Sequence, residues 1–242
     1  MKAVILAAGI GTRLKPLTNK IPKCLLKAGN KQILEITINN IIANNIDDVI
    51  MVTGYLEQQI KNFVAAKYPN LHVEYIYNEL YSSTNNIYSL WLTKDSVLGD
   101  EILLMDSDII FDKDIIAMLL TSGHDDCLAL KRHYVQDEEI KVKADDNGRV
   151  LEIGKEVKLS EAIGESIGIE KFGVATLYKL FTILDRKILV EKNVNQFYEA
   201  AFQELADKDT DIFIVDTTNH ICMEIDTVAD LYAAGKILLH QH

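Results

Sequence analysis

The amino-acid sequence predicts an α/β fold with three layers (αβα), in which helices cover both faces of a mainly parallel, mixed sheet. Two observations indicate this class. In the first half, apolar runs rich in β-branched residues alternate with segments of helical periodicity, which is typical of parallel sheets covered by helices. After about residue 126 this alternation loosens, and Asp146, Asn147 and Gly148 supply a hairpin turn that adds a small antiparallel element.

The first half of the chain divides into strands that are each followed by a helix. Continuous apolar runs indicate buried strands, and apolar positions that recur every three or four residues indicate helices. The expected strands cover residues 2–6, 48–54, 72–78 and 101–108, and the expected helices cover 33–45, 56–68, 85–97 and 110–122. This order is what a parallel sheet with helical crossovers requires.

The second half combines helices with shorter strands. A strand is expected at 127–133, two more flank the hairpin turn within 141–156, and another contains Glu165 and Ile167. The remaining predicted helices cover 174–189, 194–208 and 227–241, and the remaining predicted strands cover 212–217 and 222–226. We find no internal repeat, linker or low-complexity tract, so the sequence predicts one domain over 1–242, with parts at about 1–125 and about 126–242.

Composition excludes several classes of protein. The formal net charge of −11 argues against a nucleic-acid backbone as partner, and no apolar stretch approaches the roughly 20 residues that a membrane span requires. The first residues are too soon interrupted by charge to form a signal peptide. Three cysteines, Cys24, Cys127 and Cys222, lack CxxC spacing, which favours reduced thiols. We therefore expect a cytoplasmic protein that binds neither nucleic acid nor membrane.

A glycine-rich loop with several cations follows the first strand. Its sequence, GIGTRLKPLTNKIPK, contains two glycines, which let backbone N–H groups approach a phosphate. A dinucleotide fingerprint would need a third glycine in place of Leu14, and no Walker A pattern begins at either glycine. Arg13 and Lys23 are spaced to fold over a bound polyphosphate. The alternative interpretation is a left-handed turn with solvated surface lysines.

The same stretch resembles a known family. LAAGIGTRLKPLTNKIPKCLL is similar to the signature L-A-[AG]-G-x-G-T-R-L-x-P-x-T-x-x-x-P-K-x-[LM] of the sugar-nucleotide pyrophosphorylase and nucleotidyltransferase superfamily. This resemblance implies a Rossmann-like fold, with the nucleotide bound by the first part of the chain and an acceptor by the second. It also implies a set of residues that hold the nucleotide and its triphosphate: Leu6, Ala8, Gly9, Gly11, Thr12, Arg13 and Lys23.

Paired carboxylates end two of the predicted strands. Asp106 and Asp108 stand two apart in LLMDSD, so strand periodicity points both side chains the same way, and Glu224 and Asp226 repeat this spacing in CMEID. Ligands bind at the carboxyl ends of strands in open α/β sheets, and Mg²⁺ is held by one or two carboxylates together with phosphate oxygens. The alternative is that Asp106 and Asp226 cap the helices that follow. The resemblance implies that Asp108 and Asp226 hold the metal ion; Asp106 is expected near the nucleotide.

A polar segment indicates which nucleotide is used. YNELYSSTNNIYSLWL resembles the N-x-x-[YF]-x-x-x-N-N-x-x-S-L stretch of the choline-phosphate cytidylyltransferase branch, which implies CTP. Asn78, Asn85, Asn86 and Ser89 offer amide and hydroxyl groups that can read a base edge and a ribose. An alternative role for Asn85 and Asn86 is that of a helix N-cap and its neighbour.

Three charged residues form the predicted acceptor site. Lys155 aligns with the lysine that binds the acceptor phosphate in many relatives of this superfamily. The choline-phosphate enzymes lack that lysine, so it favours branches that act on aminoethylphosphonate, inositol phosphate or phosphoglutamine. The stretch GESIGIEKF, which contains Glu165, also resembles those branches. Glu165 or Glu224 can neutralise an ammonium head group, and a plain surface position is the alternative for Glu165.

The residue inventory offers no nucleophile. None of the six histidines has metal-ligand spacing or an evident Ser or Cys partner, and transfer to an ionised phosphate or phosphonate needs neither nucleophile nor base. We expect Arg13, Lys23, Asp108 and Asp226 to be catalytic.

The expected activity is that of a Mg²⁺-dependent cytidylyltransferase. It would join CTP to a small phosphate or phosphonate and release pyrophosphate, as a step in the decoration of cell-surface polymers. One alternative is a sugar 1-phosphate nucleotidyltransferase that uses UTP, dTTP or GTP, and another is a non-catalytic nucleotide sensor. The expected partners are these small molecules, and a homo-oligomer is left open.

Overall fold

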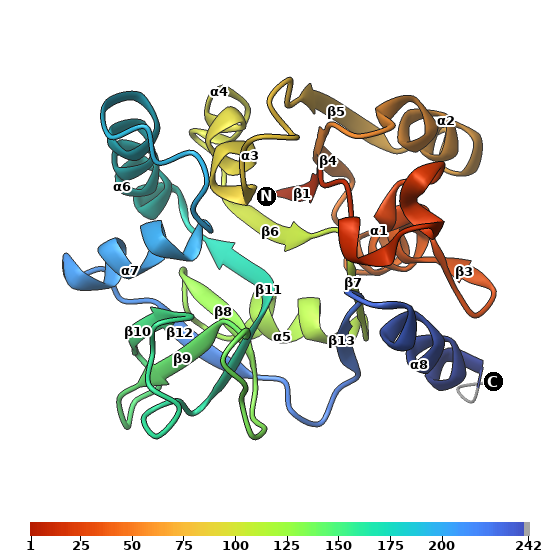
Figure 1. Ribbon diagram of the computed structural model, residues 1–242. Coiled ribbons are helices and arrows are strands. Elements are labelled where there is room, and N and C mark those ends of the chain that lie inside the picture. The colour runs from red at the N-terminus through yellow and green to blue at the C-terminus, as the bar shows by residue number, and fades with distance from the viewer. Residues whose placement is uncertain (240–242) are drawn as a thin grey trace.

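A computed structural model describes residues 1–239, and residues 240–242 lie outside the described part (Figure 1). The main sheet has nine strands, and its continuous order is β10-β9-β11-β6-β1-β4-β5, with β8 beside β11 and β12 beside β8. Helices pack on both faces of this sheet, as the apolar clusters described below show. The three-layer α/β class with a mixed sheet, predicted from the sequence, is confirmed.

The parallel part of the sheet comes from the first half of the chain. Its strands are β1 (Lys2–Ala7), β4 (Asp48–Thr53), β5 (His72–Tyr77) and β6 (Ile102–Asp106). Helices α1 (Ile33–Ala43), α2 (Glu57–Lys67), α3 (Asn86–Leu92) and α4 (Lys94–Val97) lie between them in the chain. Because β1 has a parallel neighbour on each side and helices on both faces, its sequence is apolar and buried from Ala3 to Ala7.

The second half adds antiparallel strands and the remaining helices. β11 (Gly164–Phe172) pairs antiparallel with β6, and β9 (Lys141–Ala144) and β10 (Val150–Gly154) form the predicted hairpin. The other strands are β8 (Cys127–Lys131), which is antiparallel to β11, and β12 (Phe213–Asp216), which pairs parallel with β8. The helices are α5 (Asp114–Thr121), α6 (Val174–Asp185) with a π-helical turn at Arg186–Val190, α7 (Glu199–Asp207) and α8 (Val228–Leu239).

Alternate residues of β1 face two separate apolar layers. Val4 and Leu6 belong to a buried cluster that includes residues of α3, α6 and α7. Ala3 and Ile5 belong to a second cluster with residues of α1, α2 and α5. This alternation follows from the period of two in a strand, and burial on both faces holds β1 rigidly behind the loop that follows it.

The prediction of a helix over 110–122 is wrong at its start. Residues Ile109–Phe111 form a strand, β7, which pairs antiparallel with β13 (Cys222–Glu224), and α5 begins only at Asp114. Two further strands that the sequence did not predict, β2 (Lys27–Ala28) and β3 (Lys31–Gln32), form a small hairpin.

One other predicted helix differs from the structure at its start, and another extends past the described residues. The helix expected over 194–208 begins at Glu199, because the carbonyl of Val194 instead accepts a hydrogen bond from the N–H of Asn85 at 2.9 Å. The helix expected over 227–241 is present as α8, and its last two predicted residues lie outside the described part.

The cysteines agree with what the sequence predicts for them. Cys24, Cys127 and Cys222 are buried and unpaired, as the reduced state predicted for them requires. Among residues 1–239, no helix combines the length and the apolar character needed to cross a membrane.

Candidate active site

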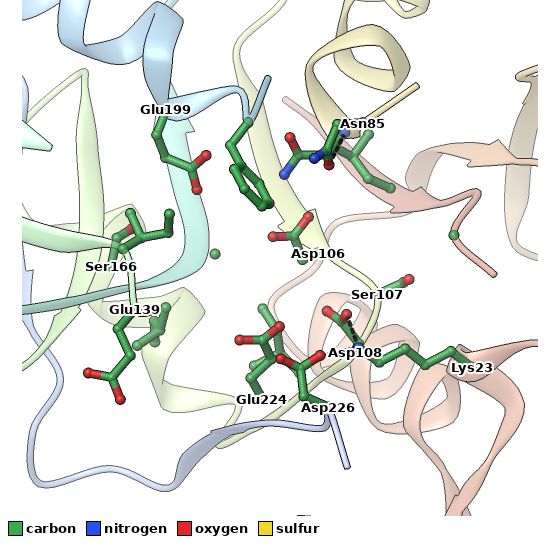
Figure 2. A pocket seen from close by; sticks show the side chains of 18 of the residues that line it. Lys23, Asn85, Asp106, Ser107, Asp108, Glu139, Ser166, Glu199, Glu224 and Asp226 are labelled. Carbon is green, nitrogen blue, oxygen red and sulfur yellow. Dashed lines mark hydrogen bonds and ion pairs between the residues drawn. The ribbon is translucent and has the colours of Figure 1, made fainter. Parts of the chain in front are cut away.

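A cavity of about 690 Å³ opens at the carboxyl ends of β1 and β6 (Figure 2). The loop after β1 forms one side, and residues of β11, β13 and the start of α7 form others. Parallel strands end together at this edge of the sheet, so the residues that follow β1 and β6 meet there. Every residue that the sequence assigns to the site lines this cavity except Gly11 and Thr12.

The two exceptions lie in the loop after β1. Gly11 has a φ of +65°, and a Cβ there would lie 3.0 Å from the Cβ of Lys23, so glycine permits a left-handed turn packed against the lysine. Thr12 begins a short 3₁₀ helix (Thr12–Leu14) and is exposed. The left-handed turn considered as an alternative is therefore present at Gly11, while Gly9 lies in the cavity wall with open space beside its Cα.

Lys23 bridges two acidic residues that are far apart in the sequence. Its Nζ donates to Asp108 Oδ2 at 2.6 Å and to Asp226 Oδ1 at 2.8 Å, and the contact with Asp108 is drawn in Figure 2. Arg13 pairs with the same oxygen of Asp226 at 2.7 Å. Burial alone would lower the pKa of Lys23, but the two carboxylates outweigh burial and raise it to about 12. The lysine is a fixed positive charge between these carboxylates.

Glu224 brings a third carboxylate to this position. Asp108, Glu224 and Asp226 each place an oxygen within 4.8 Å of the others, and we call them the open carboxylate cluster. Pairing of β13 with β7 sets its geometry, and the N–H of Ile225 donates to the carbonyl of Asp108 at 2.9 Å. Desolvation within the cavity and the charges of Asp108 and Asp226 raise the pKa of Glu224 to about 8, although the residue is exposed at the cavity surface. A set of carboxylate oxygens suits a hard divalent cation.

Asp106 and Asp108 face different partners, although strand periodicity predicts that they point the same way. β6 ends at Asp106 and the chain turns through Ser107 before β7, so the period of two does not extend to Asp108. Asp106 Oδ2 accepts a hydrogen bond from the hydroxyl of Tyr198 at 3.0 Å, while Asp108 contacts Lys23.

The side chains of Asp106 and Asp226 do not cap the helices that follow them, which was the alternative role considered. No side chain caps α5, the first helix after Asp106. Before α8, Asp230 accepts hydrogen bonds from the N–H groups of Asp226 and Thr227, at 3.1 and 2.7 Å. The carboxylate of Asp226 is left to pair with the two cations.

A second group of acids lies beside Asp106 and has no ion pair within residues 1–239. Asp106, Glu170 and Glu199 form what we call the closed carboxylate cluster, in which both glutamates are buried. Desolvation and the charges of Asp108 and Glu199 raise the pKa of Asp106 well above its ordinary range. Desolvation and the charges of Asp106 and Glu199 do the same for Glu170, and burial raises the pKa of Glu199 to about 7. Gly168 has a φ of +70°, and a Cβ there would lie 2.8 Å from Asp106 Oδ2, so only glycine fits.

The asparagine segment is held in place by its own side chains. Asn78 Nδ2 donates to Ser89 Oγ at 3.1 Å, and Asn85 is the N-cap of α3, where its Oδ1 accepts from the N–H of Asn86. Asn86 Oδ1 accepts from the N–H of Tyr198 at 2.9 Å and so ties α3 to the start of α7. The N-cap alternative is correct for Asn85, and all four segment residues also line the cavity.

Lys155 lies in the cavity wall after β10. Its Nζ donates to Glu138 Oε2 at 3.0 Å and lies 4.9 Å from the centre of the Phe197 ring. The side chain of Glu138 is 90% exposed, so this ion pair is weak and can be exchanged for a ligand.

Glu165 is part of the cavity wall and not a plain surface residue. Its Oε2 lies 3.0 Å from Nε2 of His133. Together with Glu139 these residues form a group in which each side chain places one possible metal-ligand atom within 4.8 Å of the others. Burial and the charge of Glu139 raise the pKa of Glu165. The sequence gives no sign of this group, because its members come from separate segments and the histidine has no partner at metal-ligand spacing.

The fold and the cavity define a class of protein. The family model described as nucleotidyl transferase matches residues 2–152, which contain the glycine loop, the asparagine segment and Asp108. The chain therefore belongs to the nucleotidyl transferase family, and the resemblance seen in the sequence is confirmed.

Individual relatives are similar to the chain along its whole length. The CTP:phosphoglutamine cytidylyltransferase of Campylobacter jejuni subsp. jejuni is 30% identical, over 96% of this chain and 98% of that protein. The choline-phosphate cytidylyltransferase of Streptococcus pneumoniae is 27% identical over 100% of both chains. The solved structure of the CTP:phosphocholine cytidylyltransferase LicC from Streptococcus pneumoniae has a TM-score of 0.81 at 25% identity, and the match covers 98% of each chain.

Proposed function

We propose that this protein is a Mg²⁺-dependent cytidylyltransferase that transfers CMP from CTP to a small phosphate or phosphonate and releases pyrophosphate. Phosphocholine, aminoethylphosphonate, inositol phosphate and phosphoglutamine are the types of acceptor considered. Similarity to two cytidylyltransferases over nearly the whole chain supports the choice of CTP. A cytoplasmic location, and the supply of an activated donor for cell-surface polymers, belong to the same proposal.

The observation that carries this proposal is the position of Lys23 between Asp108 and Asp226. The ammonium of Lys23 lies among these carboxylates, in a cavity that Gly9 of the glycine loop also lines, and this supports a cation site there. Asp108 and Asp226, with Glu224 beside them, would hold Mg²⁺, because this ion prefers oxygen ligands. When bound, Mg²⁺ neutralises charge on the phosphate oxygens.

The remaining residues have roles that follow from their charge and position. Arg13 and Lys23 would stabilise the negative charge that builds up on the departing pyrophosphate. The open space beside Gly9 would admit a phosphate against the backbone. Lys155 would exchange its exposed partner Glu138 for the phosphate or phosphonate of the acceptor.

The reaction balances without a protein nucleophile. An oxygen of the acceptor phosphate or phosphonate attacks the α-phosphorus of CTP and forms a new P–O bond. The bond between the α-phosphorus and the oxygen that bridges to the β-phosphorus breaks, and pyrophosphate leaves with the electron pair. A dianionic acceptor has no proton to lose, so alignment and charge neutralisation are what the protein must provide.

Pyrophosphate release measured over four nucleoside triphosphates and a panel of acceptors tests this proposal. The panel contains phosphocholine, aminoethylphosphonate, inositol phosphate, phosphoglutamine and hexose 1-phosphates. We expect turnover with CTP and an acceptor of the first four types. Turnover with UTP or dTTP and a hexose 1-phosphate would instead establish a sugar nucleotidyltransferase. Nucleotide binding without any release of pyrophosphate would indicate a non-catalytic sensor.

A further inference from the structure

The wall of the cavity across from Lys23 contains a buried carboxylate with an unused oxygen. Glu199, the first residue of α7, lines the cavity and is 5% exposed (Figure 2). Within residues 1–239, its Oε2 has no hydrogen-bond partner. A buried carboxylate oxygen without a donor costs free energy, so a donor from a ligand would stabilise it.

The surroundings of Glu199 are acidic. Asp106 and Glu170 lie close enough for the three carboxyl groups to influence one another, and neither forms an ion pair in the described part of the chain. Lys155 is the cation whose charge acts on Glu199, but its Nζ pairs with Glu138 and lies over Phe197. This wall can therefore receive a positive charge that the described residues do not supply.

The side chains of this wall suit a primary ammonium group better than a quaternary one. A quaternary ammonium has no N–H, cannot donate to Glu199 Oε2, and is bound best by the faces of several aromatic rings. Tyr81 and Phe197 are the benzene-ring side chains in the described lining, and the ammonium of Lys155 lies over the Phe197 ring. A primary ammonium has three N–H donors and needs acceptor oxygens, which Glu199 and its neighbours offer.

We propose that the acceptor is a zwitterion whose primary ammonium group binds Glu199, while its phosphate or phosphonate faces Lys155. This inference rests on the proposed cytidylyltransferase function and narrows its acceptors to amines of the aminoethylphosphonate type. The ammonium provides the missing donor for Oε2 and also neutralises part of the charge of the closed carboxylate cluster.

Matched acceptors that differ only in N-methylation test the inference. Pyrophosphate release with CTP and Mg²⁺ is measured for 2-aminoethylphosphonate and its N,N,N-trimethyl derivative, and for phosphoethanolamine and phosphocholine. We expect kcat/KM to be at least about 10-fold higher for the primary amine in each pair. The primary amine can form a charge-assisted hydrogen bond that the trimethyl compound cannot form. Equal or higher values for the trimethyl compounds would overturn the inference and leave the cytidylyltransferase proposal intact. Absence of CTP turnover with every acceptor in the full panel would overturn both.

A variant of Glu199 tests the residue itself. Glu199→Gln keeps the size of the side chain and removes its charge, so we expect KM for the primary amine to rise by about 10-fold, with KM for CTP little changed. Glu204→Gln is the control, because Glu204 lies in the same helix as Glu199 and does not line the cavity. An unchanged preference for the primary amine in Glu199→Gln, or the same loss in Glu204→Gln, would contradict the role of Glu199.

Discussion

The two carboxylate clusters of the cavity contain the same kind of side chain in opposite electrostatic settings. In the open cluster, Asp108 and Asp226 share the ammonium of Lys23, and Arg13 adds a second cation to Asp226. In the closed cluster, Asp106, Glu170 and Glu199 have no ion pair within residues 1–239, and their pKa values are raised.

The difference shows that two carboxylate clusters in one cavity can respond differently to a cation. Carboxylates that already have a cation can exchange it for another cation at little cost, because the charge balance is kept. Burial raises the pKa values of carboxylates without a cation, and these carboxylates gain most from a ligand that brings positive charge. The contrast predicts opposite responses when an acid in each cluster is neutralised.

The largest expected effect is that of Asp226→Asn in the open cluster. The substitution keeps the shape of the side chain but removes the charge that Lys23 and Arg13 contact. We expect kcat to fall by about 10³-fold or more, with a folded protein, and the same for Asp108→Asn. Pyrophosphate release and thermal unfolding followed by circular dichroism measure the two properties.

Asp114→Asn is the control for these variants, since Asp114 lies in the first turn of α5 and does not line the cavity. It should retain activity. Near-normal turnover in both Asp108→Asn and Asp226→Asn would show that the open cluster does not hold a catalytic metal ion.

A smaller effect, on stability, is expected for Lys23→Met. Without the ammonium, Asp108 and Asp226 repel each other in a partly buried place, and we expect the free energy of unfolding to fall by about 2 kcal/mol. Mg²⁺ should restore part of this loss, because it replaces the missing charge. Urea unfolding with and without Mg²⁺ measures both changes, and the exposed Lys15→Met is the control from the same loop. A loss of stability that Mg²⁺ leaves unchanged would argue against metal binding here.

The smallest expected effect has the opposite sign and belongs to Glu199→Gln. Because the pKa of Glu199 is raised to about 7, the folded protein keeps a proton that the unfolded chain releases near its ordinary value, so stability falls as pH rises through this window. Glutamine removes that loss. We expect the variant to be more stable than the parent by about 1 kcal/mol at pH 8 and similar to it at pH 4.5.

Urea unfolding at the two pH values measures this difference. The charge of Lys155 acts on Glu199, and Glu199 in turn acts on Asp106, Glu170 and Tyr198; all four groups are unchanged in the variant. A variant that is less stable than the parent at pH 8 would show that the ionised carboxylate is well accommodated without a ligand.

Local sequence patterns were sufficient to predict most of the fold. Strands such as β1 and helices such as α1 have clear periodicity and depend on near neighbours. The error at Ile109–Phe111 arose because this apolar run beside Asp112 also fits the start of an amphipathic helix. Its pairing partner, Cys222–Glu224, is far along the chain, and local periodicity contains no information about it.

The site was predictable where a continuous motif carried it. The loop from Gly9 to Lys23 and the segment that contains Asn85 were recognised as motifs and line the cavity, although the signature could not separate Gly11, which serves the turn, from Gly9. The closed cluster was not recognised beyond Asp106. Glu170 and Glu199 look in the sequence like ordinary charged residues of a strand and a helix, and only tertiary burial makes them unusual.

The pairing of β13 with β7 determines when the site can form during synthesis of the chain. Lys23, Asp108 and Asp226 come together only when β13 has docked, and Ile225 then packs in an apolar cluster with Leu14 and Ala234. A nascent chain on the ribosome can form the parallel sheet well before this point. Its cationic loop then lacks Asp226, so charge balance at the cavity is reached only after β13 and Asp226 have been synthesised.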